Sequence, residues 1–208
     1  MRLVTLIIPL LLAAPPGTDL ASTVRGAPVE SLAVALRRLE SAPGQGAEAA
    51  LMLGRLHYAR GEYHPAADAY ARAAARLDPV RKPEARYWAG LCWLALGDAP
   101  QARSALEDVA HSASAHRPLA VLALAQSWEL AGKPDRAFDL LEELLKGDPG
   151  EAGATALVRF AALATQFERH EDARRARIRL QRDYPASIEA ASARLDASAI
   201  QPPDPAAR

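Results

Sequence analysis

The chain has 208 residues, with 25 acidic and 25 basic side chains and therefore a formal net charge of zero at pH 7. A neutral chain has no global field that would recruit nucleic acid or an anionic membrane, and we expect neither as its partner. Half of the residues are hydrophobic and only 5% are aromatic. The length suits one domain of moderate size, large enough to bury a core.

The N-terminal residues have the composition of an export signal. Arg2 supplies one positive charge, and an apolar run from Leu3 to Leu12 follows it. A run of about ten residues is too short to span a bilayer and has the length of the apolar part of a signal peptide. We therefore predict a cleavable signal peptide over residues 1–21 and a mature protein that is periplasmic or secreted, without an integral membrane span. The alternative is an uncleaved first helix.

Residues 28–46 are predicted to contain an N-terminal capping helix. Leu32, Leu36 and Leu39 recur at spacings of three and four residues, which places them on one helical face. This helix is expected to cover the first of the repeated units that follow.

Four segments after this helix repeat one pattern at a spacing of 35 to 36 residues. A repeat of this length indicates a supersecondary unit that stacks on its neighbours. We place the units at about residues 47–82, 83–117, 118–150 and 151–185. Three columns define the register: Ala66, Ala102, Ala137 and Ala173; five positions earlier Gly61, Gly97, Gly132 and Glu168; and twelve positions earlier Gly54, Gly90, Ala125 and Ala161.

Each unit is predicted to consist of two short helices joined at its turn glycine. Glycine just past a helix end takes the left-handed conformation without a Cβ clash, so Gly61, Gly97 and Gly132 are predicted to end the first helices. In the first unit we expect helices at about 47–60 and 64–77. Proline cannot continue a helix, and Pro79 therefore marks the exit from this unit.

The end of the chain is predicted to form a polar cap. Ile188, Ala191 and Leu195 give one apolar face to a capping helix at 186–200. Terminal units of a repeat stack need a polar outer face, and Glu189 and Asp196 supply one here. Residues 201–208, rich in proline and alanine, are expected to be disordered.

The repeated pattern resembles the tetratricopeptide repeat. That family has a bulky residue, Leu-Gly, an aromatic, a turn glycine, small alanines and a closing proline over 34 residues. The third unit is most similar, through Val121, Leu124, Ala125, Trp128, Gly132, Ala137, Leu141, Leu144 and Pro149. The second departs by placing Arg86 at the bulky position, and the fourth by placing Glu168 at the turn. The resemblance implies an all-α fold, a right-handed α-solenoid of stacked antiparallel helix pairs.

The resemblance also implies a concave groove lined by the first helices of successive units. The residues that fall between the packing columns, and that we predict to bind a partner, are Arg55, Tyr58, Tyr87, Trp88, Leu91, Leu122, Gln126, Glu129 and Arg159, with Leu51 and Leu94 beside them. The first helix of the second unit is apolar almost all round, and such a helix is covered on every side. Two interpretations of Tyr87, Trp88 and Leu91 follow: neighbouring helices cover them, or a partner segment does.

No residue pattern indicates catalysis, a metal or a cofactor. The five histidines lack the spacing of metal ligands, and His57 stands in the column of Trp93 and Trp128, where we expect a packed core residue. Cys92 is the only cysteine and is interpreted as a small core residue.

The last unit carries a run of arginines. They are Arg174, Arg175, Arg177, Arg179 and Arg182. Such a run could bind a phosphate-rich polymer or lipid. Acidic neighbours such as Glu171, four residues before Arg175, instead favour an ordinary solvated helix face.

Repeat stacks build binding surfaces and carry no obligatory chemistry. The sequence therefore favours a non-enzymatic scaffold or adaptor in the bacterial cell envelope, with a protein or peptide partner held in the concave groove. The alternative is a regulatory or assembly subunit of an envelope enzyme or export complex.

Overall fold

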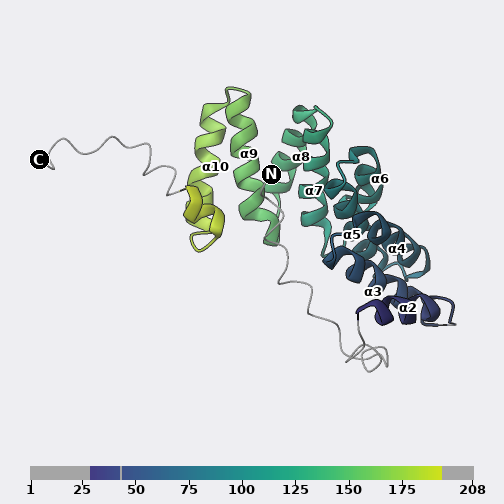
Figure 1. The fold of residues 1–208 in the computed structure, drawn as a ribbon. Helices are drawn as coiled ribbons and strands as arrows, with labels where there is room; N and C mark the ends of the chain where they lie inside the picture. The colour runs from purple at the N-terminus through teal and green to yellow at the C-terminus, as the bar shows by residue number, and fades with distance from the viewer. Residues whose placement is uncertain (1–28, 43, 194–208) are drawn as a thin grey trace, which may run out of the picture. The chain divides into compact units, whose positions relative to one another are not determined.

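The computed structural model describes residues 29–42 and 44–193, and within these ranges every regular element is helical (Figure 1). The predicted signal peptide at 1–21 and the predicted tail at 201–208 lie outside the described residues. No helix of the described part is both long enough and apolar enough to cross a membrane.

The described residues divide into two compact units, one ending at His116 and the other beginning at Arg117. We call them unit 1 and unit 2. Unit 1 contains α2 (Val29–Glu40), α3 (Gly46–Ala59), α4 (Tyr63–Arg76), α5 (Lys82–Ala95) and α6 (Ala99–Ala110). Unit 2 contains α7 (Arg117–Leu130), α8 (Pro134–Lys146), the short 3₁₀ helix η2 (Gly150–Ala152), α9 (Gly153–Gln166) and α10 (His170–Asp183), followed by helical residues 188–193.

Within each unit, consecutive helices pack against one another. In unit 1 α2 contacts α3, α3 contacts α4, α4 contacts α5 and α5 contacts α6; in unit 2 α7 contacts α8, α8 contacts α9 and α9 contacts α10. Short turns join the members of each pair, so that the chain reverses direction between them. The predicted all-α fold of stacked antiparallel helix pairs is confirmed.

The four turns inside the helix pairs share one backbone geometry. Gly61, Gly97 and Gly132 have φ of 73°, 76° and 68°, as predicted for residues that end first helices. Glu168 has φ of 59° at the equivalent position of the fourth repeat and is the only non-glycine residue with positive φ in the described chain. In every repeat the amide after this residue donates back to a carbonyl five residues earlier, for instance Asp98 N to Trp93 O at 2.9 Å and Arg169 N to Ala164 O at 2.7 Å. These bonds satisfy carbonyls that the helix end leaves open.

The column of small residues lets the two helices of a pair approach closely. A Cβ added at Gly54 would lie 2.7 Å from the ring of Tyr70, and one at Gly90 would lie 2.5 Å from Leu106. Tyr70 and Leu106 are both fully buried and stand in the same register of α4 and α6. A glycine on the first helix therefore makes room for a large side chain from the second helix of the same pair.

The first described helix of unit 1 is α2, which packs its apolar face on α3. Ala33 and Leu36 join Ala49, Leu53 and Ala69 in one buried cluster. At the other end of the described chain, the helical residues 188–193 form hydrogen bonds with α9 and α10. Glu189 accepts a hydrogen bond from Thr155 at 2.7 Å, and the amide of Gln181 donates to the carbonyl of Ala190 at 2.9 Å.

Candidate partner-binding site

The predicted site residues lie on the first helices of the four repeats. Arg55 and Tyr58 are on α3, and Tyr87, Trp88 and Leu91 are on α5, all within unit 1. The residues of unit 2 are Leu122, Gln126 and Glu129 on α7 and Arg159 on α9. The structure brings together members of the set within each unit.

Trp88 lies at the centre of an aromatic cluster in unit 1. Its ring centroid is 5.5 Å from that of Tyr58, 5.5 Å from that of Tyr87 and 6.3 Å from that of Tyr70, which stacks on it. Trp88 and Tyr87 are each only 8% exposed. Of the two interpretations of this helix, coverage by neighbouring side chains therefore describes Tyr87 and Trp88, while Leu91 is half-buried.

Tyr58 forms the accessible rim of this cluster. Its ring makes edge contacts with Trp88 and Tyr63, both at 5.5 Å between centroids. Burial raises the pKa of the Tyr58 hydroxyl to about 12, so the group stays protonated at physiological pH and can act as a hydrogen-bond donor. Tyr58 as a whole is half-buried.

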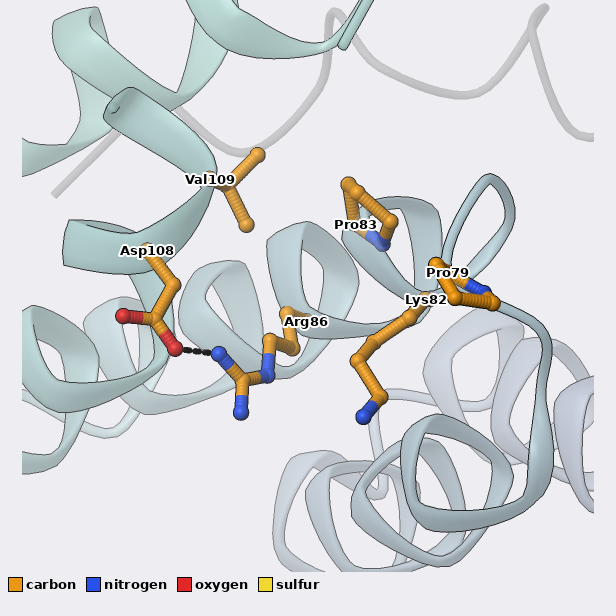
Figure 2. A pocket seen from close by; sticks show the side chains of 6 residues that line it. All are labelled: Pro79, Lys82, Pro83, Arg86, Asp108 and Val109. Atoms are coloured by element: carbon orange, nitrogen blue, oxygen red, sulfur yellow. Dashed lines mark ion pairs between the residues drawn. The ribbon is translucent and has the colours of Figure 1, made fainter. Parts of the chain in front are cut away.

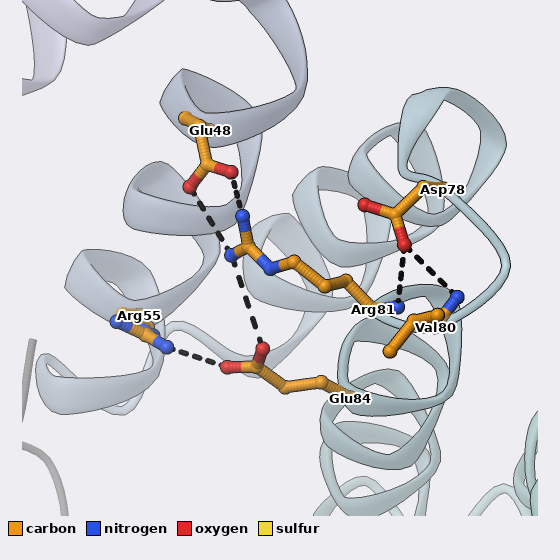
Figure 3. A network of polar contacts seen from close by, with 6 residues as sticks. All are labelled: Glu48, Arg55, Asp78, Val80, Arg81 and Glu84. Atoms are coloured by element: carbon orange, nitrogen blue, oxygen red, sulfur yellow. Dashed lines mark hydrogen bonds and ion pairs between the residues drawn. The ribbon is translucent and has the colours of Figure 1, made fainter. Parts of the chain in front are cut away.

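Arg55 belongs to a chain of charged groups that connects α3 with α5 (Figure 3). Its Nη2 donates to Glu84 Oε1 at 2.5 Å, and the side chains are 25% and 20% exposed. Arg81 binds both carboxylate oxygens of Glu48 and approaches Glu84 to 4.0 Å. The hydrogen bond to Glu48 raises the pKa of Arg81. Arg55 is therefore held in place by Glu84 rather than extended into solvent.

In unit 2 an ion pair occupies the register that an aromatic pair occupies in unit 1. Arg159 Nη1 donates to Glu129 Oε1 at 2.7 Å, with side chains 26% and 31% exposed. Glu129 corresponds to Tyr58, and Arg159 corresponds to Trp88, in the repeat alignment. Leu122 and Gln126 on the same helix as Glu129 are half-buried. Unit 2 thus presents a mixed polar and apolar face at positions where unit 1 has aromatic side chains that cover one another.

Two groove residues expected from the sequence lie in the core instead. Leu51 is fully buried, and Leu94 is buried as well. The repeat register places both on the first helices, but the neighbouring helices of unit 1 cover them. The prediction that they line a groove is therefore wrong.

Sequence reasoning missed an exposed residue of the fourth repeat. Val158 on α9 is 39% exposed, and Ala162 one turn later is also exposed. Val158 follows Leu122 by 36 residues and so falls in the column of Leu51, Tyr87 and Leu122. This repeat spacing could have identified it. The weak match of the fourth unit at Glu168 and Arg177 obscured the register.

His57 and Cys92, the histidine and the cysteine interpreted as core residues, are both buried. His57 is buried, as predicted, and its Nδ1 lies 2.5 Å from Glu62 Oε2, a hydrogen bond that lowers the pKa of Glu62. Cys92 is fully buried and its pKa is raised to about 12 by that burial, so that its nucleophilic thiolate form is scarce. Over residues 29–42 and 44–193, no three His, Cys, Asp or Glu side chains are grouped as metal ligands.

The arginine run of α10 is interleaved with acidic partners. Arg175 pairs with Asp172 rather than with Glu171, and Arg182 pairs with Asp183 at 2.6 Å. Arg179 also reaches Asp183, at 3.3 Å, and donates to the carbonyl of Leu145 at 2.6 Å. These contacts are those of a solvated helix face with local ion pairs.

Comparison with known protein families finds a match within the repeated segments. The sequence pattern described as "Tetratricopeptide repeat" matches residues 51–118 and 94–152. A search of the curated proteins finds no match.

Solved structures show the same fold at low sequence identity. The structure titled "Crystal structure of MamA" has a TM-score of 0.61 and 18% identity over 71% of this chain and 84% of that one. The structure titled "Functional Characterization of Pseudomonas Aeruginosa pilF" has a TM-score of 0.58 and 17% identity over 85% of both chains. At such identities the likeness concerns the fold alone.

Proposed function

We propose that this protein is a protein-interaction scaffold that binds a partner segment on the exposed part of its first helices. The support is the match to the tetratricopeptide repeat over residues 51–118 and 94–152 and the fold shared with solved structures. Repeat stacks of this kind provide extended binding surfaces, and the chemistry in their assemblies belongs to other chains. The proposed site lies within unit 2 and consists of the exposed Val158 together with the half-buried residues of α7 and α9. In unit 1 the half-buried Arg55 and Tyr58 form a separate candidate face.

The face of unit 2 carries this proposal. Val158 remains 39% exposed in a column whose members in unit 1 are buried. Beside it, Arg159 and Glu129 hold each other at 2.7 Å while each keeps more than a quarter of its side chain in water. Hot spots of protein interfaces combine an apolar anchor with arginine or aromatic side chains that become fully desolvated in the complex. Val158 and Arg159 supply these two elements on adjacent positions.

The ion pair between Arg159 and Glu129 would also shape the partner's chemistry. Surface pairs contribute about 0–1 kcal/mol, so a partner can exchange this one for its own contacts at little loss. A partner carboxylate would take the guanidinium of Arg159, and a partner amide or cation would take Glu129. An extended or helical segment that carries both types of group beside an apolar side chain fits this face.

We further propose that the scaffold acts in the bacterial cell envelope. The support is the short apolar run that follows Arg2 in the sequence, which has the length of a signal peptide. Cell fractionation and N-terminal sequencing of the native protein test this part. We expect a mature protein that begins after residues 14–27 and lies outside the cytoplasm, whereas a cytosolic protein that begins at Met1 would contradict it.

The binding face is tested by capture followed by measured affinity. The full chain, immobilised, is exposed to an envelope extract, and the retained proteins are identified by mass spectrometry. The dissociation constant of the purified partner is then measured for wild-type protein, for Val158→Asp and for Arg159→Ala. Loss of a hot-spot side chain weakens binding by about thirtyfold, equivalent to roughly 2 kcal/mol.

A matched control separates the face from general surface effects. Ile178 on α10 is 56% exposed, so Ile178→Asp introduces the same charge at another exposed apolar site. We expect it to leave the affinity unchanged. The double variant of Arg55→Ala and Tyr58→Ala reports the contribution of unit 1. If Val158→Asp, Arg159→Ala and the double variant all keep the wild-type melting temperature and the wild-type affinity, the first helices do not form the binding face.

A further inference from the structure

Arg86 occupies a core position of the repeat. The equivalent residues of the other repeats are Ala50, Val121 and Leu157, and all three are buried. The side chain of Arg86 is instead 35% exposed and forms an ion pair with Asp108 at the end of α6. A residue that breaks the rule of its own repeat without an evident gain in packing indicates either a local accommodation or a functional site.

The departure coincides with a small pocket in unit 1 (Figure 2). The pocket has a volume of about 170 Å³ and is lined by Pro79, Lys82, Pro83, Arg86, Asp108 and Val109. Sites for drug-sized molecules occupy roughly 300–1,000 Å³, so this one has the size for a single side chain or a small anion. Val109 is only 1% exposed, so the two prolines provide the accessible apolar surface, and the charged groups lie beside it.

The charges at the pocket do not balance. Lys82 and Arg86 are four residues apart on α5, so both cations lie on the same helical face. Like charges at this spacing destabilise a helix slightly, and Asp108 offsets only one of them. Within the described part of the chain, the ammonium group of Lys82 has no ion-pair partner. Two cations and one carboxylate leave one positive charge, which a monovalent anion would neutralise.

From these features we infer that the pocket between α5 and α6 binds one acidic side chain, Asp or Glu, of a partner protein. The carboxylate of the partner contacts Lys82 and the outer edge of the Arg86 guanidinium, and its methylene groups lie against Pro79 and Pro83. A carboxylate suits the site better than a phosphate dianion, because the single excess positive charge matches one negative charge and Asp108 stands close by. This site is separate from the first-helix face proposed above, and its test does not depend on that face.

Binding of the side chain is tested with a minimal probe on the full chain. N-acetyl-glutamate amide carries one carboxylate, and N-acetyl-glutamine amide is its neutral isostere. Titration of each is followed by NMR through the amide of Arg86 and the methyl groups of Val109. We expect saturable shifts with the glutamate probe at a dissociation constant of about 1 mM, and no saturable shift with the glutamine probe.

Variants assign the effect to the pocket. Lys82→Gln should weaken binding of the glutamate probe by about fivefold, since it removes an exposed ionic contact. Lys146→Gln, at an exposed lysine on α8 of unit 2, should change nothing. Arg86→Leu restores an apolar residue of the repeat and should abolish binding while the protein keeps its helical circular dichroism.

Three results would overturn the inference. The first is equal shifts with the glutamate and glutamine probes, which would indicate apolar contact alone. The second is an unchanged dissociation constant for Lys82→Gln. The third is tighter binding of inorganic phosphate than of the glutamate probe at the same resonances, which would make the pocket a phosphate site.

Discussion

The turn of the fourth repeat offers a direct measurement of backbone strain. Glu168 has φ of 59°, while Gly61, Gly97 and Gly132 occupy the same turn with φ of 68° to 76°. The left-handed conformation costs an L-residue roughly 1–2 kcal/mol. Replacement by glycine removes this cost, but glycine loses more backbone entropy on folding, and this loss offsets about 0.4–1 kcal/mol of the stabilisation. We therefore expect Glu168→Gly to raise the free energy of unfolding by about 0.5–1 kcal/mol.

The environment of Glu168 supports a purely conformational origin for this gain. The residue is exposed, and in the described part of the chain its carboxylate takes part in no ion pair. The assay is urea denaturation followed by circular dichroism, with a parallel thermal melt that should shift upward by about 1–4 °C. The reverse change, Gly132→Glu, lies in the same unit at a position where an added Cβ meets nothing within 4 Å. It should therefore lose a similar amount through φ alone. If Glu168→Gly fails to stabilise and Gly132→Glu is neutral, the left-handed backbone is not what limits these turns.

Three further changes probe packing and charge. Gly90→Ala should lower the free energy of unfolding by about 1–3 kcal/mol in urea denaturation, because its Cβ would lie 2.5 Å from Leu106. The same change in a Leu106→Ala background should cost less than it does in the wild-type chain, and equal losses in the two backgrounds would exclude this clash. Tyr70→Phe should leave the free energy of unfolding unchanged or raise it by about 1 kcal/mol, because the buried hydroxyl has no hydrogen-bond partner among the described residues. A clear decrease in the free energy of unfolding would show that the hydroxyl is hydrogen-bonded. Glu62 has a pKa below its ordinary value of 4.5, mainly through its hydrogen bond to His57. Its contribution is therefore present above pH 4.5 and lost as the pH falls through the lower folded value, so the melting temperatures of wild type and Glu62→Gln should converge on acidification rather than diverge.

The sequence by itself determined the repeat, its helix pairs and their turns. A glycine column spaced by 35 to 36 residues specifies where the left-handed residue of each turn stands, since this requirement is local to a few backbone dihedrals. The spacing also located Glu168 as the odd member of that column. The buried state of His57 followed from its place among Trp93 and Trp128. Each of these properties depends on the periodicity of a helix or on the geometry of a single turn.

Only the tertiary structure decided which residues of the first helices remain accessible. Trp88 is covered by Tyr58, which precedes it by 30 residues, and the same register in unit 2 holds the pair of Glu129 and Arg159. Periodicity assigns a residue to a helix face. The side chains of the next helix determine whether that face is covered by aromatic rings or remains exposed to solvent. Arg86 illustrates the same limit. The sequence showed that Arg86 departs from the repeat pattern. The packing of α5 against α6 placed its side chain beside Asp108 at the edge of a pocket. The sequence could not predict this pocket, because the space left at a core position depends on the side chains of the neighbouring helix.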